Sequence, residues 1–206
     1  SYGAVENAIG ADQIIFDGDS KAFRPYFPRA SSIAQFKSTV PDAIIDVNNM
    51  PAVPKFILAA NGGQTYSIME IEGVYYLYVT QFYNVVDDGD LSVGSSSITD
   101  LSGCKDIALA KYFATSEAGN AFFYATDNGV YSFSYTSGQT NQRDIYTSEV
   151  GEVVTCLYLL PSGGFPTAGS VLWIGVWNET AKEGKLVEYE IDPISGAVTS
   201  QKTNMF

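Results

Sequence analysis

Short runs of β-branched and aromatic residues, separated by residues that favour turns, dominate the chain. The clearest runs occupy positions 73–82, 121–126, 130–135, 170–177 and 185–191. Each run is short and bounded by Gly, Asn, Asp or Ser, which is typical of β-strands. Between the second and third runs, Asp127-Asn-Gly129 predicts a tight hairpin turn. The best helix candidate, around Ser31 to Lys37, spans a turn or two, so we expect an all-β fold.

Strand–turn–strand units recur along the chain, with turn glycines at Gly18, Gly89, Gly138 and Gly196. Their irregular spacing, roughly 50 to 70 residues, suits four-stranded propeller blades of ~40–50 residues with insertions. We therefore predict a β-propeller-like array of four-stranded antiparallel meander blades, a partial propeller of about 3.5 blades. The predicted blade units are residues 12–30, 54–97, 106–147 and 152–206.

The first unit differs from the others because it keeps two strands, Gln13–Phe16 and Ala22–Phe27. Its turn at Gly18 is assigned to a third-to-fourth strand hairpin, and residues 31–53 to a long connection. Residues 1–206 are then one propeller-type domain or a C-terminal fragment of one. Open sheet edges invite association with another chain, unless Ser1–Ala11 serves as a makeshift strand. One alternative is a ring of four blades closed by Ser1–Ala11. Another is a small self-contained domain in which the first unit is an ordinary terminal hairpin.

The composition of the chain excludes several classes of function. The chain has 206 residues, 46% of them hydrophobic, and a formal net charge of −12. This charge argues against nucleic-acid binding and against docking on anionic lipid through basic residues. There is no histidine, which excludes Ser-His-Asp triads, Cys–His pairs and histidine metal ligands. We expect no catalytic residues, no metal and no cofactor.

Cys104 and Cys156 lack metal-ligand spacing, and the sequence leaves open whether they form a disulfide.

Two tryptophans are the candidate ligand-binding residues. Trp173 and Trp177 lie four positions apart with Gly175 between them. In a strand both side chains point to one face, where they would form a platform on which a sugar ring stacks. The alternative is packing between adjacent blades, with a neighbouring side chain pressing into the gap at Gly175.

Other charged residues suggest chemistry but have simpler explanations. Asp17–Asp19 and Asp87–Asp90 offer oxygen ligands for calcium, yet they fall where hairpins turn and lack the EF-hand pattern. A sialidase binds a carboxylate with three arginines, and the chain has three, Arg24, Arg29 and Arg143. Two of them lie five residues apart, whereas such a site needs arginines that converge from separate blades, and the Ser-x-Asp-x-Gly-x-Thr-Trp box of sialidases is missing. We read these residues as turn and surface positions.

Four glutamates, Glu70, Glu72, Glu188 and Glu190, lie at strand spacing. Paired carboxylates hydrolyse glycosidic bonds when they are about 5–10 Å apart in a pocket. Alternate positions on a solvated strand face explain these glutamates equally well.

Four segments carry a resemblance to a known family: Phe16–Phe23, Ala108–Ser116, Phe123–Phe133 and Gly184–Gly196. They are similar to propeller repeats in the C-terminal half of the PKD-like family lipoproteins of Bacteroidetes. The resemblance covers most of residues 12 to 202 and rests on blade-forming motifs, some of which kelch-type propellers share. It implies a seven- or eight-bladed propeller behind an immunoglobulin-like PKD domain. It also implies export and lipid anchoring at the outer membrane or cell surface.

Three functional hypotheses follow. The first is a non-catalytic cell-surface binding or scaffold module of an exported bacterial lipoprotein, which recognises a glycan, a peptide or a partner outer-membrane protein. Its membrane link would be a lipid anchor outside this chain. The second is a carboxylate-based glycosidase or lyase on a propeller scaffold. The third is a structural array of blades that seats a neighbouring domain.

Overall fold

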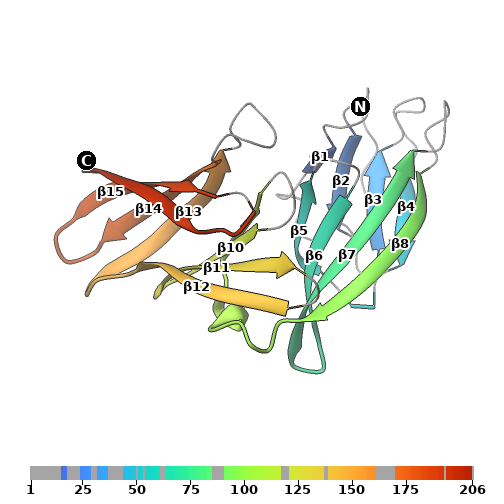
Figure 1. Ribbon diagram of the computed structural model, residues 1–206, viewed down its shortest axis with the longest axis horizontal. Helices are drawn as coiled ribbons and strands as arrows, with labels where there is room; N and C mark the ends of the chain where they lie inside the picture. Colours follow the sequence, from blue (N-terminus) through green and yellow to red (C-terminus); the bar gives the residue numbers. More distant parts are fainter. Residues whose placement is uncertain are drawn as a thin grey trace. The chain divides into compact units, whose positions relative to one another are not determined.

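The computed structural model (Figure 1) is all-β in the part of the chain that it describes. The structure describes residues 15–17, 24–28, 32–36, 44–49, 51–52, 54–60, 64–84, 91–116, 121–136, 139–160, 170–192 and 194–205. Within these ranges sixteen strands and one short 3-10 helix are found. They form four-stranded sheets in which all neighbouring strands are antiparallel, as the sequence predicted. None of the described helices is long and apolar enough to span a membrane.

The chain divides into two compact units, Ser1–Ser102 and Gly103–Phe206. The first unit holds two sheets, each a meander in which sequence neighbours pair. One consists of β1 (Ile15–Asp17), β2 (Arg24–Pro28), β3 (Ser32–Phe36) and β4 (Ile44–Asn49). The other consists of β5 (Pro54–Ala60), β6 (Gln64–Ile71), β7 (Val74–Asn84) and β8 (Leu91–Asp100). Strand β1 contacts β5, and β4 contacts β8.

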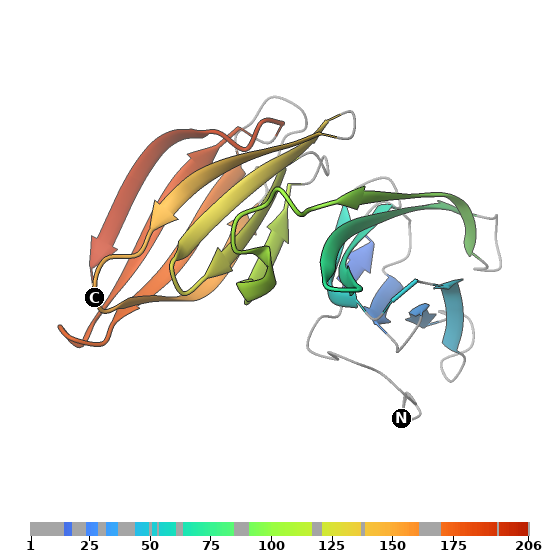
Figure 2. The same ribbon diagram turned by 90° about the horizontal axis from the view of Figure 1, so that it is seen from below.

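The second unit repeats this organisation, and Figure 2 shows its strands in green to red. After the 3-10 helix η1 (Ile107–Leu109) come β9 (Tyr112–Thr115), β10 (Ala121–Thr126), β11 (Gly129–Thr136) and β12 (Gln139–Thr147). The last sheet consists of β13 (Glu152–Leu160), β14 (Ser170–Asn178), β15 (Glu183–Ile191) and β16 (Val198–Met205). Strands β9, β10 and β11 contact β13, so the two sheets of this unit pack against one another.

The core of the second unit lies between these two sheets. Strand β14 alternates: Leu172, Ile174 and Val176 are buried, while the residues between them are partly exposed. Full burial of such a side chain stabilises the fold by about 1.5–3 kcal/mol. The buried members of this core are Ala121, Phe123, Ala125, Val130, Val154, Leu172, Ile174, Val176, Val187, Tyr189 and Ile191.

The hairpin predicted at Asp127-Asn-Gly129 is confirmed. Thr126 pairs with Gly129, which leaves Asp127 and Asn128 as the two turn residues between β10 and β11. Gly129 has φ +150°, and a Cβ built on it would lie 2.1 Å from the backbone oxygen of Tyr146. Any side chain at this position would collide with backbone, which explains the glycine.

Three expectations about residues 15–53 are wrong. The segment 31–53 is not a connection, because it contains β3 and β4. Ser31–Lys37 is not a helix, since Ser32–Phe36 pairs with strands on both sides. The strands on either side of Gly18 are the first and second strands of their sheet, β1 and β2, and this sheet has four strands where two were expected. The described residues therefore form four complete sheets in place of about 3.5.

The physical reason is that β3 and β4 are short. A run such as Ser-Ile-Ala-Gln-Phe fits a helical turn or a strand equally well, and pairing partners decide between them. Pro54, directly after this segment, begins β5, a position at which a strand tolerates proline. Two kinds of prediction fall outside the described residues: the turns at Gly18, Gly89 and Gly138, and the makeshift strand at Ser1–Ala11.

Candidate functional site

The sheet β13–β16 presents an aromatic face on the side opposite the core. Trp173 and Trp177 are partly exposed and occupy the positions of β14 that alternate with its buried residues. Both indoles therefore lie on one side of the strand, as their spacing predicted. We define the aromatic face by four residues: Tyr158, Trp173, Trp177 and Glu188.

Trp173 is held between two neighbours from adjacent strands. Tyr158 on β13 and Glu188 on β15 both stand opposite Trp173 in the strand register. The Tyr158 and Trp173 ring centroids are 6.2 Å apart, at an angle of 37°. The indole Nε1–H of Trp173 donates a hydrogen bond of 3.1 Å to Oε2 of Glu188. These contacts fix the indole, while Tyr158 stays 55% exposed.

A β-bulge turns Tyr158 to this face. The register between β13 and β14 shifts between Val154 and Cys156, so Thr155 is an extra residue. Leu157 and Leu159 then pack on the core, and Tyr158 points outward. Without the bulge, strict alternation from buried Val154 would place Tyr158 on the core side.

The gap at Gly175 is filled by a neighbouring side chain. A Cβ built on Gly175 would lie 2.5 Å from Sγ of Cys156 and 3.0 Å from Oγ1 of Thr155. The floor between Trp173 and Trp177 is therefore the Cys156 side chain. Cys156 is exposed, Cys104 is buried, and they do not form a disulfide with one another.

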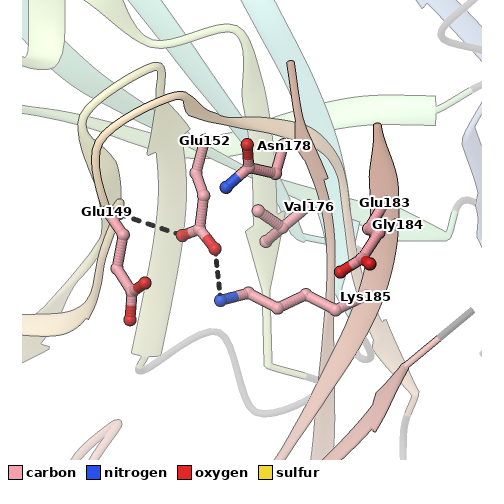
Figure 3. A pocket seen from close by; sticks show the side chains of 7 residues that line it. All are labelled: Glu149, Glu152, Val176, Asn178, Glu183, Gly184 and Lys185. Atoms are coloured by element: carbon pink, nitrogen blue, oxygen red, sulfur yellow. Dashed lines mark hydrogen bonds and ion pairs between the residues drawn. The ribbon is translucent and has the colours of Figure 1, made fainter. Parts of the chain in front are cut away.

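A second candidate site is a polar cavity of about 270 Å³ within the second unit (Figure 3). We name it the glutamate cavity. Its walls come from the turn between β12 and β13 and from the ends of β14 and β15. It is lined by Glu149, Glu152, Val176, Asn178, Glu183, Gly184 and Lys185.

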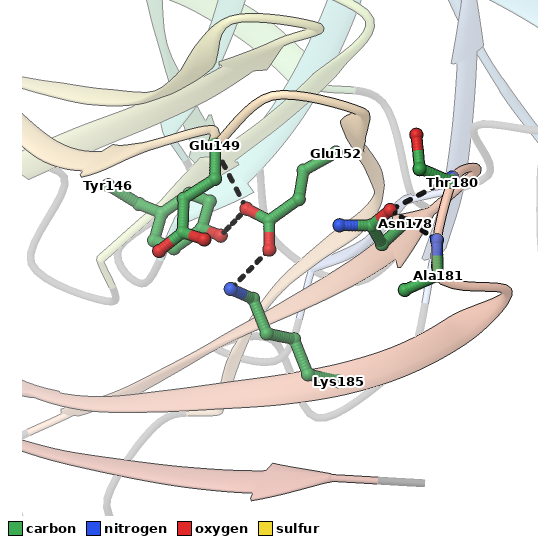
Figure 4. A network of polar contacts seen from close by, with 7 residues as sticks. All are labelled: Tyr146, Glu149, Glu152, Asn178, Thr180, Ala181 and Lys185. Atoms are coloured by element: carbon green, nitrogen blue, oxygen red, sulfur yellow. Dashed lines mark hydrogen bonds and ion pairs between the residues drawn. The ribbon is translucent and has the colours of Figure 1, made fainter.

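The Glu152 carboxylate is the centre of a hydrogen-bond network beside this cavity (Figure 4). Its Oε1 lies 2.5 Å from the Lys185 ammonium. Its Oε2 accepts hydrogen bonds from the Tyr146 hydroxyl and from the Glu149 backbone N–H, the latter 2.9 Å long. The Lys185 ammonium also lies 5.3 Å from the centre of the Tyr146 ring. Tyr146 belongs to one sheet, and Glu152 and Lys185 to the other, so the network links the two sheets.

The network shifts the titration of its members. Burial alone would raise the pKa of the Glu152 carboxyl, but the hydrogen bonds from Lys185 and Tyr146 outweigh burial and hold it below its ordinary value. Burial alone would lower the pKa of Lys185, and the hydrogen bonds to Glu152 and Tyr146 raise it instead. Burial and the bond to Glu152 raise the pKa of Tyr146 to about 12. Glu152 is thus fixed as an anion and is a poor proton donor at neutral pH.

Asn178 shapes the rim of the glutamate cavity. Its side-chain oxygen accepts hydrogen bonds from the backbone N–H groups of Thr180 and Ala181, each 2.9 Å long. These bonds close the turn between β14 and β15, a local role for which asparagine is favoured. Across the rim, Gly151 has φ +85°, and a Cβ there would meet Thr180 Oγ1 at 2.7 Å.

The glutamate cavity was missed from the sequence. Tyr146, Glu152 and Lys185 lie in three different strands, and no local motif connects them. The glutamates singled out from the sequence do not line it. Glu70 accepts a hydrogen bond of 3.0 Å from the Tyr75 hydroxyl.

The remaining sequence candidates are dispersed. Glu72 lies in the turn between β6 and β7 with φ 51°. Glu190 is exposed on β15 beyond Glu188. Arg143 donates a hydrogen bond to the backbone oxygen of Ser195. Arg24 lies in β2.

Most of the acidic turns, and with them Arg29, lie outside the described residues. Of these turns Asp17 alone is described, as the last residue of β1. Among the described side chains, no group of three or more Cys, Asp or Glu residues is arranged to hold a metal ion.

Comparisons with known proteins give weak likenesses. No protein-family model matches the chain, and the comparison with curated proteins finds no relative. The chain resembles a solved structure from Bacteroides uniformis that is provisionally named a 6-phosphogluconolactonase. The identity is 12% and the TM-score 0.40, over 91% of this chain and 71% of that one. A protein from Lactobacillus plantarum matches with 10% identity and a TM-score of 0.39, over 93% of this chain and 65% of that one.

The expectation that the chain has no catalytic activity is contradicted by this comparison. The similar chain from Bacteroides uniformis carries the name of an enzyme. The lack of histidine excludes histidine-based mechanisms but leaves carboxylates, lysines and tyrosines as proton donors and acceptors. We therefore withdraw the expectation. The likeness itself assigns no activity to this chain.

Proposed function

We propose that the chain is a ligand-binding module whose aromatic face binds carbohydrate. The observation that supports this proposal is the arrangement of Trp173, fixed between the Tyr158 ring and the Glu188 carboxylate on an exposed sheet surface. Exposed aromatic surface of this kind marks an interaction site more often than scattered apolar residues do. A sugar ring offers an apolar face of C–H groups for the indole and hydroxyl groups for a carboxylate.

Rigidity favours this use of the face. An indole that is already held by a ring contact and a hydrogen bond loses little side-chain freedom when a ligand stacks on it. The indole N–H is already bonded to Glu188, so ligand stacking leaves no buried polar group unpaired. A peptide, a partner protein or a further sheet packed on the same face is the competing outcome.

A glycan array followed by isothermal titration calorimetry tests the proposal. We expect the wild-type chain to bind a glycan and Trp173→Ala to lose at least about tenfold in affinity, which corresponds to about 1.4 kcal/mol. The matched control is Tyr75→Ala, which removes a partly exposed aromatic ring that also contacts a glutamate, but in the first unit. Equal loss in both variants, or capture of a peptide in place of a glycan, would overturn the proposal.

A carboxylate-based glycosidase or lyase is the second candidate function. The observation that favours it is a single cavity lined by Glu149, Glu152 and Glu183. Because Glu152 is held as an anion, an acid role would fall to Glu149 or Glu183. Release of reducing ends from polysaccharide, abolished in Glu149→Gln or Glu183→Gln but kept in Glu179→Gln, would support this function. Activity that survives both cavity variants would eliminate it.

We also propose that the sheets are successive blades of a propeller-type domain. The support is a repeated relation within each unit: β1 contacts β5, and β9 contacts β13, so the first strands of consecutive sheets are adjacent. First strands of neighbouring blades meet in this way around a propeller axis. An experimental structure in which one rotation relates every sheet to the next would support the proposal, and unrelated sandwiches would refute it.

Display at the cell surface is a proposal that rests on the sequence resemblance described above. Labelling of intact source cells with an antibody against this chain is the direct test. Signal on intact cells supports surface display, and signal after permeabilisation alone refutes it.

A further inference from the structure

The distance between the two tryptophans sets the size of ligand that the aromatic face accommodates. Trp173 and Trp177 are four residues apart on the same strand. At ~3.4 Å per residue, their Cα atoms are separated by about 13–14 Å. A single sugar ring covers one indole but does not reach the other. A chain of sugars laid along β14 reaches both.

A small side chain forms the surface between the two indoles. Gly175 has no side chain, and Sγ of Cys156 lies 2.5 Å from the position that a Cβ on Gly175 would take. Trp177 itself packs beside Gly184 of β15, whose added Cβ would lie 3.8 Å from the indole. The small side chain of Cys156 between the rings, and Gly184 beside Trp177, leave room for a ligand that extends from one indole to the other.

The outward side of β15 is acidic. The outward positions of β15 carry two glutamates, Glu188 and Glu190, which alternate with its inward residues. In the register with β16, Lys202 stands opposite Glu188 and Ser200 stands opposite Glu190. The whole chain has a net charge of −12. Like charges repel, so uronate or sulfated chains bind poorly here.

We propose that the outer face of β14 binds an uncharged oligosaccharide that runs along the strand and stacks on both Trp173 and Trp177. This inference rests on the proposed carbohydrate-binding function and adds the ligand's length, direction and charge. Trp173, fixed by Tyr158 and Glu188, is the primary contact. Trp177 is the second contact, which short sugars do not reach.

Calorimetric titration with sugars of increasing length tests this inference. The probes are glucose, the neutral hexasaccharides of the cello-, laminari-, manno- and xylo- series, and polygalacturonate. We expect one neutral hexasaccharide to bind at least about tenfold more tightly than its monosaccharide, a difference of about 1.4 kcal/mol. Polygalacturonate should bind more weakly than that hexasaccharide.

Two variants separate the contacts. Trp177→Ala should remove the gain in affinity with chain length, whereas Trp173→Ala should weaken the binding of every probe. Trp177→Phe keeps a ring and should retain most of the gain, which separates lost stacking from lost folding. Melting temperatures verify that each variant is folded.

The outcomes distinguish failure of the oligosaccharide inference from failure of the proposed carbohydrate-binding function. Binding that is independent of chain length, or tighter for polygalacturonate, overturns this inference and leaves carbohydrate binding intact. Binding of no probe by a folded wild-type chain overturns the proposed function and the inference together.

Discussion

Replacing Lys185 with methionine removes the cation that neutralises the buried carboxylate of Glu152. The Glu152 side chain is 5% exposed and that of Lys185 is 17% exposed, so solvent compensates little for the loss. Breaking a buried ion pair by removing one partner costs about 3–5 kcal/mol. Glu152 keeps its hydrogen bonds from Tyr146 and the Glu149 backbone, so we expect Lys185→Met to cost about 3 kcal/mol.

The reverse substitution should cost less. Glu152→Gln leaves a lysine whose long side chain can turn its ammonium toward solvent, so we expect about 1–2 kcal/mol. The double variant removes both charges, and substituting both partners of a buried pair is often close to neutral. We expect it to recover at least half of the loss seen in Lys185→Met.

A second ion pair supplies a matched control. Lys111 and Asp127 are also 2.5 Å apart, but their side chains are 52% and 53% exposed. Exposed pairs contribute about 0.2–1 kcal/mol, so Lys111→Met should cost less than about 1 kcal/mol. Because the separation is the same, the difference between the two variants measures the effect of burial.

Urea unfolding followed by tryptophan fluorescence gives the free energies of unfolding. Trp173 and Trp177, the two tryptophans of the chain, belong to the second unit, so the signal reports the unit that contains the network. Equal costs for Lys185→Met and Lys111→Met, or a double variant less stable than Lys185→Met, would refute the reasoning.

Three further predictions concern single groups. Tyr146 has a pKa of about 12 in the folded chain against ~10 in the unfolded chain, so its contribution to the free energy of unfolding is complete below pH ~10 and is lost as the pH rises toward 12. Tyr146→Phe should therefore flatten the fall of the melting temperature between pH ~10 and 12, and an unchanged slope would contradict this reasoning. Gly175→Ala brings its Cβ against Sγ of Cys156 and should cost roughly 1–2 kcal/mol in urea unfolding, with partial rescue by Cys156→Ala; no rescue would contradict the contact. Iodoacetamide should label Cys156 in the native chain and Cys104 after unfolding, as read by mass spectrometry, whereas equal native labelling would contradict their burial.

The sequence predicted those elements whose local signals agree with one another. At 121–136 an aromatic run, a two-residue turn and a second run together indicate a hairpin. In β14 the period of two predicted that both tryptophans share a face. The strands β3 and β4 were missed because each is too short to show a period, and their pairing with neighbours determines their conformation.

The side chains that contact Trp173 could not be predicted from the residues near it in the sequence. Tyr158 faces Trp173 because a bulge at Thr155 reverses the alternation of β13. The residue types from Glu152 to Leu160 do not predict this bulge. Glu188 was singled out as a carboxylate, but its bond to the indole depends on the register between β14 and β15. The Glu152 network similarly depends on how two sheets pack.

Nuclear magnetic resonance of the indole N–H groups tests carbohydrate binding at the aromatic face most directly. The chain contains two tryptophans, so two indole N–H signals report the two proposed contacts. On titration with the neutral hexasaccharide that the calorimetric series selects, we predict saturable shifts of both signals. Titration with the corresponding monosaccharide should shift the Trp173 signal alone. Binding of the hexasaccharide that leaves both indole signals unmoved would contradict the account.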